Sequence, residues 1–228
     1  MIRPMERTAE RTAAIEDYVR AIYDLQRTES PVPTTVLARQ KGVAPASVTG
    51  MIKRLHELGL VDHERYGGVR LTRSGEKVAL EVIRHHRLIE TFLAEAMGLA
   101  WDEVHEEAHR LEHHISENLE DRMAEMLGNP VRDPHGAPIP PKDGPFTEPA
   151  YASLADVQAA QKVVIREVMD EDPARLRYLA ELGLLPDVVV DVIAVGPFDG
   201  PITLRVGADG TEHAIGRELA RTISVEMV

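Results

Sequence analysis

The histidines of this chain gather in one acidic stretch. Residues 105–114 read HEEAHRLEHH and supply four groups at helical spacing, His105, His109, Glu112 and His113. At about 100° per residue on an α-helix, the four side chains share one face. Nitrogen and oxygen donors on one rigid face are the ligands that a borderline or hard divalent cation needs. The spacing therefore predicts a metal site carried by a helix.

Two further segments offer ligands to such a site. His86 and Glu90 stand one helical turn apart upstream, so a second helix presents a ligand pair. Asp17 is a carboxylate among apolar neighbours and can reach across as an additional ligand. His85 and His114 fall on other helix faces and are interpreted as surface residues. An isolated i,i+4 pair is typical of a solvated helix face, so the density of the histidine-rich stretch carries the metal hypothesis.

The same stretch permits a different chemistry. Residues 105–109 match the pattern H-E-x-x-H, in which His105 and His109 would hold zinc and Glu106 would act as the general base of a metallopeptidase. Against this alternative, the five-letter pattern recurs by chance, and Glu112 and His113 crowd the same face. The sequence also indicates no substrate cleft. A regulatory metal site is the favoured interpretation.

The first 75 residues predict a winged helix-turn-helix domain. Apolar residues at helical spacing predict a first helix over 13–27, and glycine-terminated segments predict two more helices over 35–42 and 45–59. Residues 60–75 then alternate around a glycine turn in the manner of a β-hairpin. Twelve basic and nine acidic residues lie in these 75, whereas the whole chain has a net charge of −12. A mildly basic head on an acidic body favours an anionic partner at one end.

The third predicted helix has the composition of a DNA-reading helix. Small side chains at its start let the helix approach base edges, and hydroxyl and cationic groups hold phosphates. The predicted DNA contacts are Ala46, Ser47, Thr49, Gly50, Lys53 and Arg54, with Arg65 and Arg70 of the hairpin reaching the adjacent backbone. A helix pair that merely packs, as in a protein-interaction module, is the alternative.

Two long amphipathic helices are predicted downstream, over 76–97 and over 101–127. Their apolar stripes exceed what a small core needs, which predicts an isologous homodimer. The residues expected to take part include Leu88, Phe92, Leu93, Leu111, Ile115 and Leu119. Seven prolines at 130–149 and little periodicity predict a stiff linker without packing of its own.

The last part of the chain predicts a small β-barrel. Short strands are expected at 163–168, 188–195, 201–206 and 223–227, with one short helix over 174–183. The fold class is therefore mainly α with a small β domain. The predicted domains are a DNA-binding head (1–75), a helical metal-binding and dimerisation domain with the linker (76–150) and a barrel (151–228).

Composition narrows the class of protein and its cellular compartment. The chain has 228 residues, 43% hydrophobic and 28% charged, which is typical of a globular protein. The absence of cysteine excludes disulfides and thiolate metal sites, in keeping with a reducing cytoplasm. No signal-peptide core and no run of about 20 apolar residues is visible, so we expect a cytoplasmic protein without a membrane partner.

These elements and several strings resemble the diphtheria toxin repressor family, in both its iron-dependent and manganese-dependent branches. The resemblance covers nearly the whole chain. The strings are Asp17-Tyr18 with Ile22-Tyr23, Ser47-Val48-Thr49, Leu58-Gly59-Leu60-Val61, Leu71-Thr72 with Gly75, His86-Arg87-Leu88 with Glu90, Val104-His105-Glu106-Glu107-Ala108, Glu112-His113, and Pro134-His135-Gly136 with Pro138-Ile139-Pro140.

The resemblance implies a metal-activated repressor of metal-uptake genes that binds a palindromic double-stranded operator as a homodimer, with an SH3-like (FeoA-like) third domain. The implied ion is Mn²⁺ or Fe²⁺, with Co²⁺, Zn²⁺ or Cd²⁺ able to substitute in vitro. The implied primary ligands are Asp17, His109, Glu112 and His113. The implied ancillary ligands are His86, Glu90 and His105, with Glu171 and Asp172 of the third domain as further oxygen donors.

Three positions depart from the family pattern. His109 stands where iron-type members have cysteine and manganese-type members glutamate, and Asp17 stands where iron-type members have methionine. Arg20 occupies a position where some manganese-type members have a ligating glutamate. Asp17 and the resemblance favour manganese over iron. A winged-helix regulator with an organic effector is the third functional hypothesis, beside the metallopeptidase.

Overall fold

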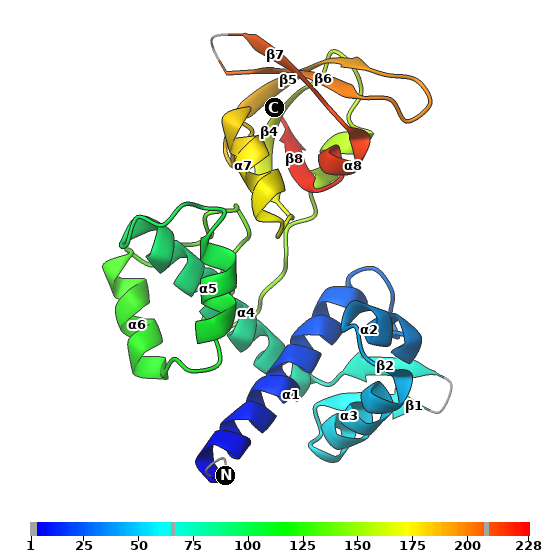
Figure 1. Cartoon of the computed structure of the whole chain (residues 1–228), viewed down its shortest axis with the longest axis vertical. Coiled ribbons are helices and arrows are strands. Elements are labelled where there is room, and N and C mark those ends of the chain that lie inside the picture. Colours follow the sequence, from blue (N-terminus) through cyan, green and yellow to red (C-terminus); the bar gives the residue numbers. More distant parts are fainter. Residues whose placement is uncertain (1–3, 65–66, 208–209) are drawn as a thin grey trace. The chain divides into compact units, whose positions relative to one another are not determined.

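The computed structural model of the chain describes residues 4–64, 67–207 and 210–228 (Figure 1). The chain divides into two compact units. The first unit comprises Met1–His85 and Glu112–Ile115, and the second comprises His86–Leu111 and Ser116–Val228. The short segment 112–115 thus clusters with the amino-terminal elements although the residues on either side of it do not.

The first unit is a winged helix-turn-helix, as predicted. Three helices precede a two-stranded antiparallel hairpin, in which Val61 pairs with Leu71. The core between them contains Ile22, Leu37 and Ile52, all almost completely buried. The elements are α1 (Pro4–Gln26), α2 (Thr34–Gln40), α3 (Pro45–Glu57), β1 (Val61–Glu64), β2 (Gly68–Leu71) and the first half of α4 (Arg73–Glu95).

The start of α4 packs closely on the hairpin because residue 75 has no side chain. A Cβ atom added at Gly75 would lie 2.0 Å from the carbonyl oxygen of Leu60, a distance that no side chain can occupy. Thr72 also donates from its hydroxyl to the carbonyl of Gly59 at 2.7 Å. This contact fixes where α4 begins, and α4 carries two of the predicted metal ligands, His86 and Glu90.

The second unit contains the rest of α4, together with α5 (Val104–Leu111) and α6 (Glu117–Met126). The prediction of one continuous helix over 101–127 is wrong, because the chain leaves helical geometry after Leu111. Ser116 starts the next helix by accepting a hydrogen bond from the backbone N–H of Leu119, which is a typical amino-terminal cap. The single-face argument therefore applies to His105 and His109 only.

The proline-rich segment is packed, so the prediction of a linker without packing is wrong for residues 133–140. Ala137 and Ile139 are buried, and so are Asp133 and His135. The guanidinium of Arg87 on α4 donates to the carbonyl of Pro138 at 2.6 Å. A side chain of α4 thus satisfies a backbone carbonyl of this segment, which is held in place without regular secondary structure of its own.

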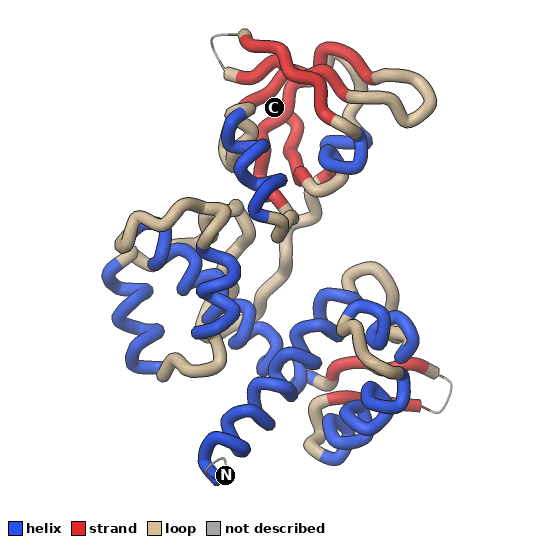
Figure 2. Tube along the Cα trace, viewed as in Figure 1, coloured by secondary structure: helices blue, strands red, loops and turns tan. Residues whose placement is uncertain are grey.

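The carboxyl-terminal part is a small barrel-like domain built on a six-stranded antiparallel sheet in the order β3-β8-β4-β5-β6-β7 (Figure 2). Its core contains Leu154, Ile165 and Leu176, all completely buried. The elements are β3 (Ala152–Ser153), a 3-10 turn (Leu154–Asp156), β4 (Lys162–Val168), α7 (Pro173–Glu181), β5 (Val189–Val195), β6 (Ile202–Val206), β7 (Thr211–Ile215), α8 (Arg217–Ala220) and β8 (Ile223–Met227).

The four predicted strands and the predicted helix of this domain are present. Strands β3 and β7 and helix α8 were not predicted, because β3 and α8 are only a few residues long and β7 buries only its last residue. Within the described residues, no helix combines the length and the apolar character that a membrane span requires.

Candidate metal centres and DNA-binding face

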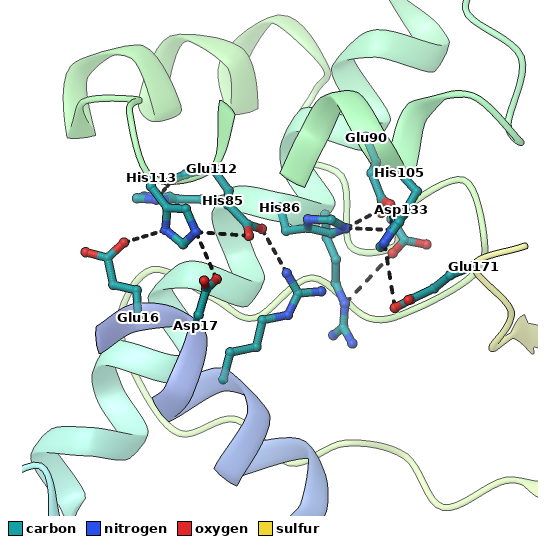
Figure 3. A network of polar contacts seen from close by, with 12 residues as sticks. Glu16, Asp17, His85, His86, Glu90, His105, Glu112, His113, Asp133 and Glu171 are labelled. Atoms are coloured by element: carbon teal, nitrogen blue, oxygen red, sulfur yellow. Dashed lines mark hydrogen bonds and ion pairs between the residues drawn. The ribbon is translucent and has the colours of Figure 1, made fainter. Parts of the chain in front are cut away.

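The first candidate centre joins α1 to the segment that follows α5. The ring of His113 donates from Nδ1 to Oε2 of Glu16 at 2.6 Å and from Nε2 to Oδ1 of Asp17 at 3.1 Å (Figure 3). Oε1 of Glu112 lies 3.4 Å from Nε2 of His113. Asp17, Glu112 and His113 thus present potential ligand atoms within 4.8 Å of one another. The structure brings together three of the four predicted primary ligands.

The proton on His113 is held tightly in this arrangement. Hydrogen bonds to Asp17 and Glu16 raise the pKa of His113 to about 9, although burial of the ring opposes that shift. The ring is therefore an imidazolium that bridges two carboxylates at neutral pH. A divalent ion at this position has to displace that proton.

Glu112 is held at both of its ends. Its carboxylate is completely buried and accepts a hydrogen bond from Nη1 of Arg20 at 2.8 Å. Its backbone oxygen lies 3.3 Å from Nδ1 of His85. The interpretation of His85 as a surface residue is wrong, because its ring is buried against this backbone, whereas His114 is exposed as expected.

Sequence reasoning missed Glu16 as a partner of this centre. Its position next to Asp17 was visible, but two consecutive residues of a helix do not normally face the same neighbour. His109, the fourth predicted primary ligand, lies on α5 in the second unit and has an exposed side chain. Its place beside the other three ligands stays a prediction from the sequence.

The second candidate centre surrounds the buried carboxylate of Glu90. Oε1 of Glu90 lies 2.9 Å from Nε2 of His86 and 3.1 Å from Nδ1 of His105, so the structure brings the three predicted ancillary ligands together (Figure 3). Burial alone would raise the pKa of Glu90, but the surrounding histidines hold it well below its usual range. The carboxylate is therefore ionised and ready to bind a cation.

One carboxylate of the barrel lies near this centre. Oε1 of Glu171 lies 3.7 Å from Nε2 of His105. Asp172 has a different task, since its carboxylate accepts the backbone N–H of Ala174 at 2.8 Å and caps α7. Its contacts give no support to the predicted role of Asp172 as a metal ligand.

Two residues of the proline-rich segment complete the surroundings of Glu90. Nδ1 of His135 lies 3.8 Å from Oε2 of Glu90, and Glu90, Asp133 and His135 present ligand atoms within 4.8 Å of one another. Burial, followed by the charge of Glu90, raises the pKa of Asp133 to about 7. His135 belongs to one of the strings that resemble the family, but neither His135 nor Asp133 was predicted as a ligand. The available signal was an Asp-Pro-His-Gly run inside a segment without periodicity.

The geometry of α5 does not suit a peptidase. Glu106, the expected general base, is exposed and pairs with Arg110 at 3.4 Å. The ring of His105 is turned toward Glu90. A general base has to lie within hydrogen-bond reach of the metal-bound water, and Glu106 is instead engaged on the solvent side of its helix.

The predicted DNA contacts form one solvent-facing side of α3. Val48, Ile52 and Leu55 are buried in the core, and Met51 is partly buried against it. The exposed residues are Ala46, Ser47, Thr49, Gly50 and Lys53, with Arg54 partly exposed. Arg70 is exposed on β2, whereas Arg65 lies outside the described residues.

The sequence matches three described families in the order of these elements. Residues 10–69 match the iron-dependent repressor N-terminal DNA-binding domain, residues 72–141 match the iron-dependent repressor metal-binding and dimerisation domain, and residues 152–227 match the FeoA domain. The match to the DNA-binding family includes Asp17 and ends at the hairpin. The match to the dimerisation family includes Glu112 and His113 of the first centre, the histidines and Glu90 of the second, and the packed segment.

Individual proteins resemble the chain over almost its full length. The iron-dependent repressor IdeR of Mycobacterium leprae (strain TN) is 31% identical, over 93% of this chain and 96% of that protein. A solved manganese-dependent transcriptional repressor in complex with manganese superimposes with a TM-score of 0.86 at 39% identity, covering 94% of this chain and 100% of the other. The structure of ScaR with bound Cd²⁺ has a TM-score of 0.80 at 30% identity, covering 94% and 99%.

Proposed function

This chain belongs to the iron-dependent (diphtheria toxin) repressor family, and from that premise we propose which of its side chains make DNA binding depend on a divalent ion. Its partners are double-stranded DNA and a second copy of itself, in keeping with its DNA-binding and dimerisation domains. The protein is a metal-dependent transcription repressor and not an enzyme. Its activating ion is Mn²⁺ or Fe²⁺, and other divalent metals can take the place of that ion.

We propose that the activating ion is bound by Asp17, His109, Glu112 and His113. The observation that carries this proposal is the pair of hydrogen bonds from His113 to Glu16 and Asp17. They already hold the segment after α5 against the helix that belongs to the DNA-binding head. Two carboxylates and two imidazoles without sulfur suit Mn²⁺, Fe²⁺, Co²⁺ or Zn²⁺, so the donor set fits the ion that the family uses.

The ion makes this attachment stronger and more specific than a proton can. Its consequence for DNA binding is geometric, because a dimer reads a palindromic operator only when its two recognition helices sit about one DNA turn apart. A shift from mostly inactive to mostly active heads needs about 5 kcal/mol of differential metal affinity. Linkage requires that operator DNA in turn raise the affinity for the ion.

The second centre holds an ancillary ion through His86, Glu90 and His105. Glu171 is a further oxygen donor from the barrel, and Asp133 and His135 are further donors from the packed segment. Solved structures similar to this chain include a manganese-dependent repressor in complex with manganese, and ScaR with bound Cd²⁺ or Zn²⁺. For this chain, the carboxylate oxygen of Asp17 favours manganese as the cellular signal. The proposed targets are metal-uptake genes, and the proposed location of the protein is the cytoplasm.

A DNA-capture experiment tests the proposal. A pool of palindromic duplexes is titrated with the purified protein, with and without Mn²⁺, for wild type, His109→Ala and Glu106→Gln. We expect metal-dependent capture that is lost in His109→Ala and kept in Glu106→Gln, which serves as the matched control from the same helix. Capture by the wild type that does not respond to metal would instead support an organic effector. Metal-dependent peptide cleavage lost in Glu106→Gln would support a peptidase.

A further inference from the structure

The barrel is attached to the helical part of the second unit by residues 132–137, which we call the bracket. The bracket leaves the helical part with Asp133 and His135 buried beside Glu90. Its backbone then meets strand β4 of the barrel, where the N–H of Val168 donates to the carbonyl of His135 at 2.9 Å. One short segment therefore contacts both a candidate metal centre and the sheet of another domain.

A β-bulge in β4 receives the bracket. The pairing of β4 with β8 shifts register between Ile165 and Glu167, so Arg166 is left out of the ladder. Its carbonyl oxygen accepts a hydrogen bond from Nη1 of Arg132 at 3.1 Å. The same guanidinium donates to the carbonyl of Gly136 at 2.9 Å and, through Nη2, to the hydroxyl of Tyr151 at 2.6 Å. The backbone group that the bulge frees is thus satisfied by the bracket.

Gly136 makes this approach possible. It adopts φ of +89°, and a Cβ atom added there would lie 2.0 Å from the carbonyl oxygen of Arg166 and 3.0 Å from its carbonyl carbon. Both obstructing atoms belong to backbone, which cannot rotate away as a side-chain end can. The contact is therefore specific to glycine for steric as well as conformational reasons.

A second set of contacts lies beside the bracket. His135 donates from Nε2 to the carbonyl of Trp101 at 2.8 Å, and the indole of Trp101 packs against the hydrophobic core of the barrel. The neighbouring Asp102 is buried and accepts a hydrogen bond from Arg177 of α7 at 2.7 Å. An ion pair, an indole and a backbone junction thus connect the two domains through protein groups alone.

We propose that the bracket docks the barrel on the helical part before any metal ion binds, and that this docking presents Glu171 to His105 as a ready oxygen donor. In this arrangement Arg132 and Gly136 are positioning residues for the second centre. The docking itself needs no metal. The consequence for ion binding rests on the proposed function, since it concerns the ancillary ion.

The single tryptophan of the chain makes the docking measurable. Trp101 stands at the junction, so its fluorescence reports whether the barrel covers it. We compare the metal-free full-length wild type with Gly136→Ala and with Gly144→Ala. Gly144 is a matched control from the same proline-rich segment, because it also has positive φ (+106°) but has no atom within 4 Å of an added Cβ.

In metal-free protein we expect a red-shifted emission and stronger acrylamide quenching for Gly136→Ala, and no such change for Gly144→Ala. Arg177→Met, which removes the exposed partner of Asp102, should shift emission in the same direction without strain in the backbone. Circular dichroism verifies that the variants remain folded. A wild-type Trp101 as accessible without metal as in Gly136→Ala would overturn the proposal, and so would unchanged quenching in both Gly136→Ala and Arg177→Met.

Measuring the affinity of each centre for Mn²⁺ then distinguishes a failure of this proposal from a failure of the proposed function. In Gly136→Ala, the affinity of the second centre should fall about tenfold, as is common when groups that orient ligands are lost. The first centre should be unaffected. A wild type whose barrel is docked but whose second centre binds no ion would contradict the proposed ancillary site and leave the docking proposal standing. An undocked Gly136→Ala with unchanged affinity at the second centre would overturn the positioning role of the bracket.

Discussion

The guanidinium of Arg20 lies 2.8 Å from the carboxylate of Glu112, a residue 92 positions further along the chain. The carboxylate is completely buried and Arg20 is 22% exposed, so the pair is shielded from solvent. A buried carboxylate that loses a cationic partner is strongly destabilising. Arg20 therefore neutralises one proposed metal ligand before the ion arrives, and it orients one oxygen of Glu112 away from His113.

Replacement of Arg20 tests this electrostatic role. Arg20→Met should lower the free energy of unfolding of the metal-free protein by about 3 kcal/mol, because Glu112 keeps its burial and loses its counterion. Mn²⁺ should recover part of that loss, since a bound ion stabilises the folded state and supplies positive charge. Urea unfolding with and without Mn²⁺ measures both effects. Arg39→Met, at an exposed position of α2, is the control, and an equal loss in the two variants would contradict the assigned role.

The raised pKa of His113 predicts the effect of pH on the metal-free protein. The pKa is about 9 in the folded chain against an ordinary value of 6.5. A group whose folded pKa is raised stabilises the fold fully below the unfolded pKa and ceases to do so as pH rises through the folded one. The stability that depends on His113 should therefore be present at pH 6 and decline between about pH 6.5 and 9. Unfolding curves of wild type and His113→Gln should differ most at the lower pH.

The same proton predicts how metal activation depends on pH. The ion must displace the proton from His113, so the affinity of the first centre for Mn²⁺ should rise with pH up to about 9. Activation should accordingly weaken as pH falls toward 6. Operator binding at subsaturating Mn²⁺, followed at pH 6 and pH 8, measures this effect. Equal operator affinity at the two pH values would argue against His113 as a ligand.

Asp133 offers a direct test of the second centre. Asp133→Asn keeps the shape that accepts the backbone N–H groups of His135 and Ala137 but removes the charge. If this carboxylate helps to hold the ancillary ion, the affinity for Mn²⁺ at that centre should fall between tenfold and about a hundredfold. Equilibrium dialysis in a His113→Ala background isolates the second centre. Asp143→Asn, exposed in the same segment, should behave as wild type, and an unchanged affinity in Asp133→Asn would remove this residue from the ligand set.

Lys53 tests the DNA-binding face. The side chain is exposed on α3, and its nearest recorded acidic partner is Glu57 at 3.9 Å, a weak surface pair. Lys53→Ala should weaken binding to all sequences by a similar factor and reduce the slope of log affinity against log salt by about 1, as expected for one lost phosphate contact. Lys162→Ala, in the barrel, should leave the slope unchanged. A loss confined to one operator sequence would assign Lys53 to base reading instead.

The sequence predicts the winged helix-turn-helix well because the spacing of its apolar residues agrees with the residues that the domain buries. Ile22 falls on the buried face that the apolar spacing of residues 13–27 predicts. The break between α5 and α6 was not predictable from spacing, since Leu111, Ile115 and Leu119 continue a helical period straight across it. The capping serine at 116, followed by acidic residues, was the local signal that could have revealed the break.

The errors at His85 and Asp133 have a common physical cause. Helical-wheel reasoning gives a helix one buried face, whereas α4 buries Val82, Ile83 and His85 as well as His86 and Glu90. Asp133 lies in a segment whose place is fixed by contacts with α4 and β4, and periodicity carries no information about such contacts. Ligand pairs within one helix were thus visible in the sequence, while ligands brought together by the tertiary fold were not.

The position of Glu90 also limits the stoichiometry of the second centre. One of its oxygens faces His86 and His105, and the other faces His135. Two divalent ions on opposite sides would share this one carboxylate, so they would lie close together where their mutual repulsion is weakly screened. We therefore expect the second centre to hold one ion, and the chain to saturate at two ions per subunit.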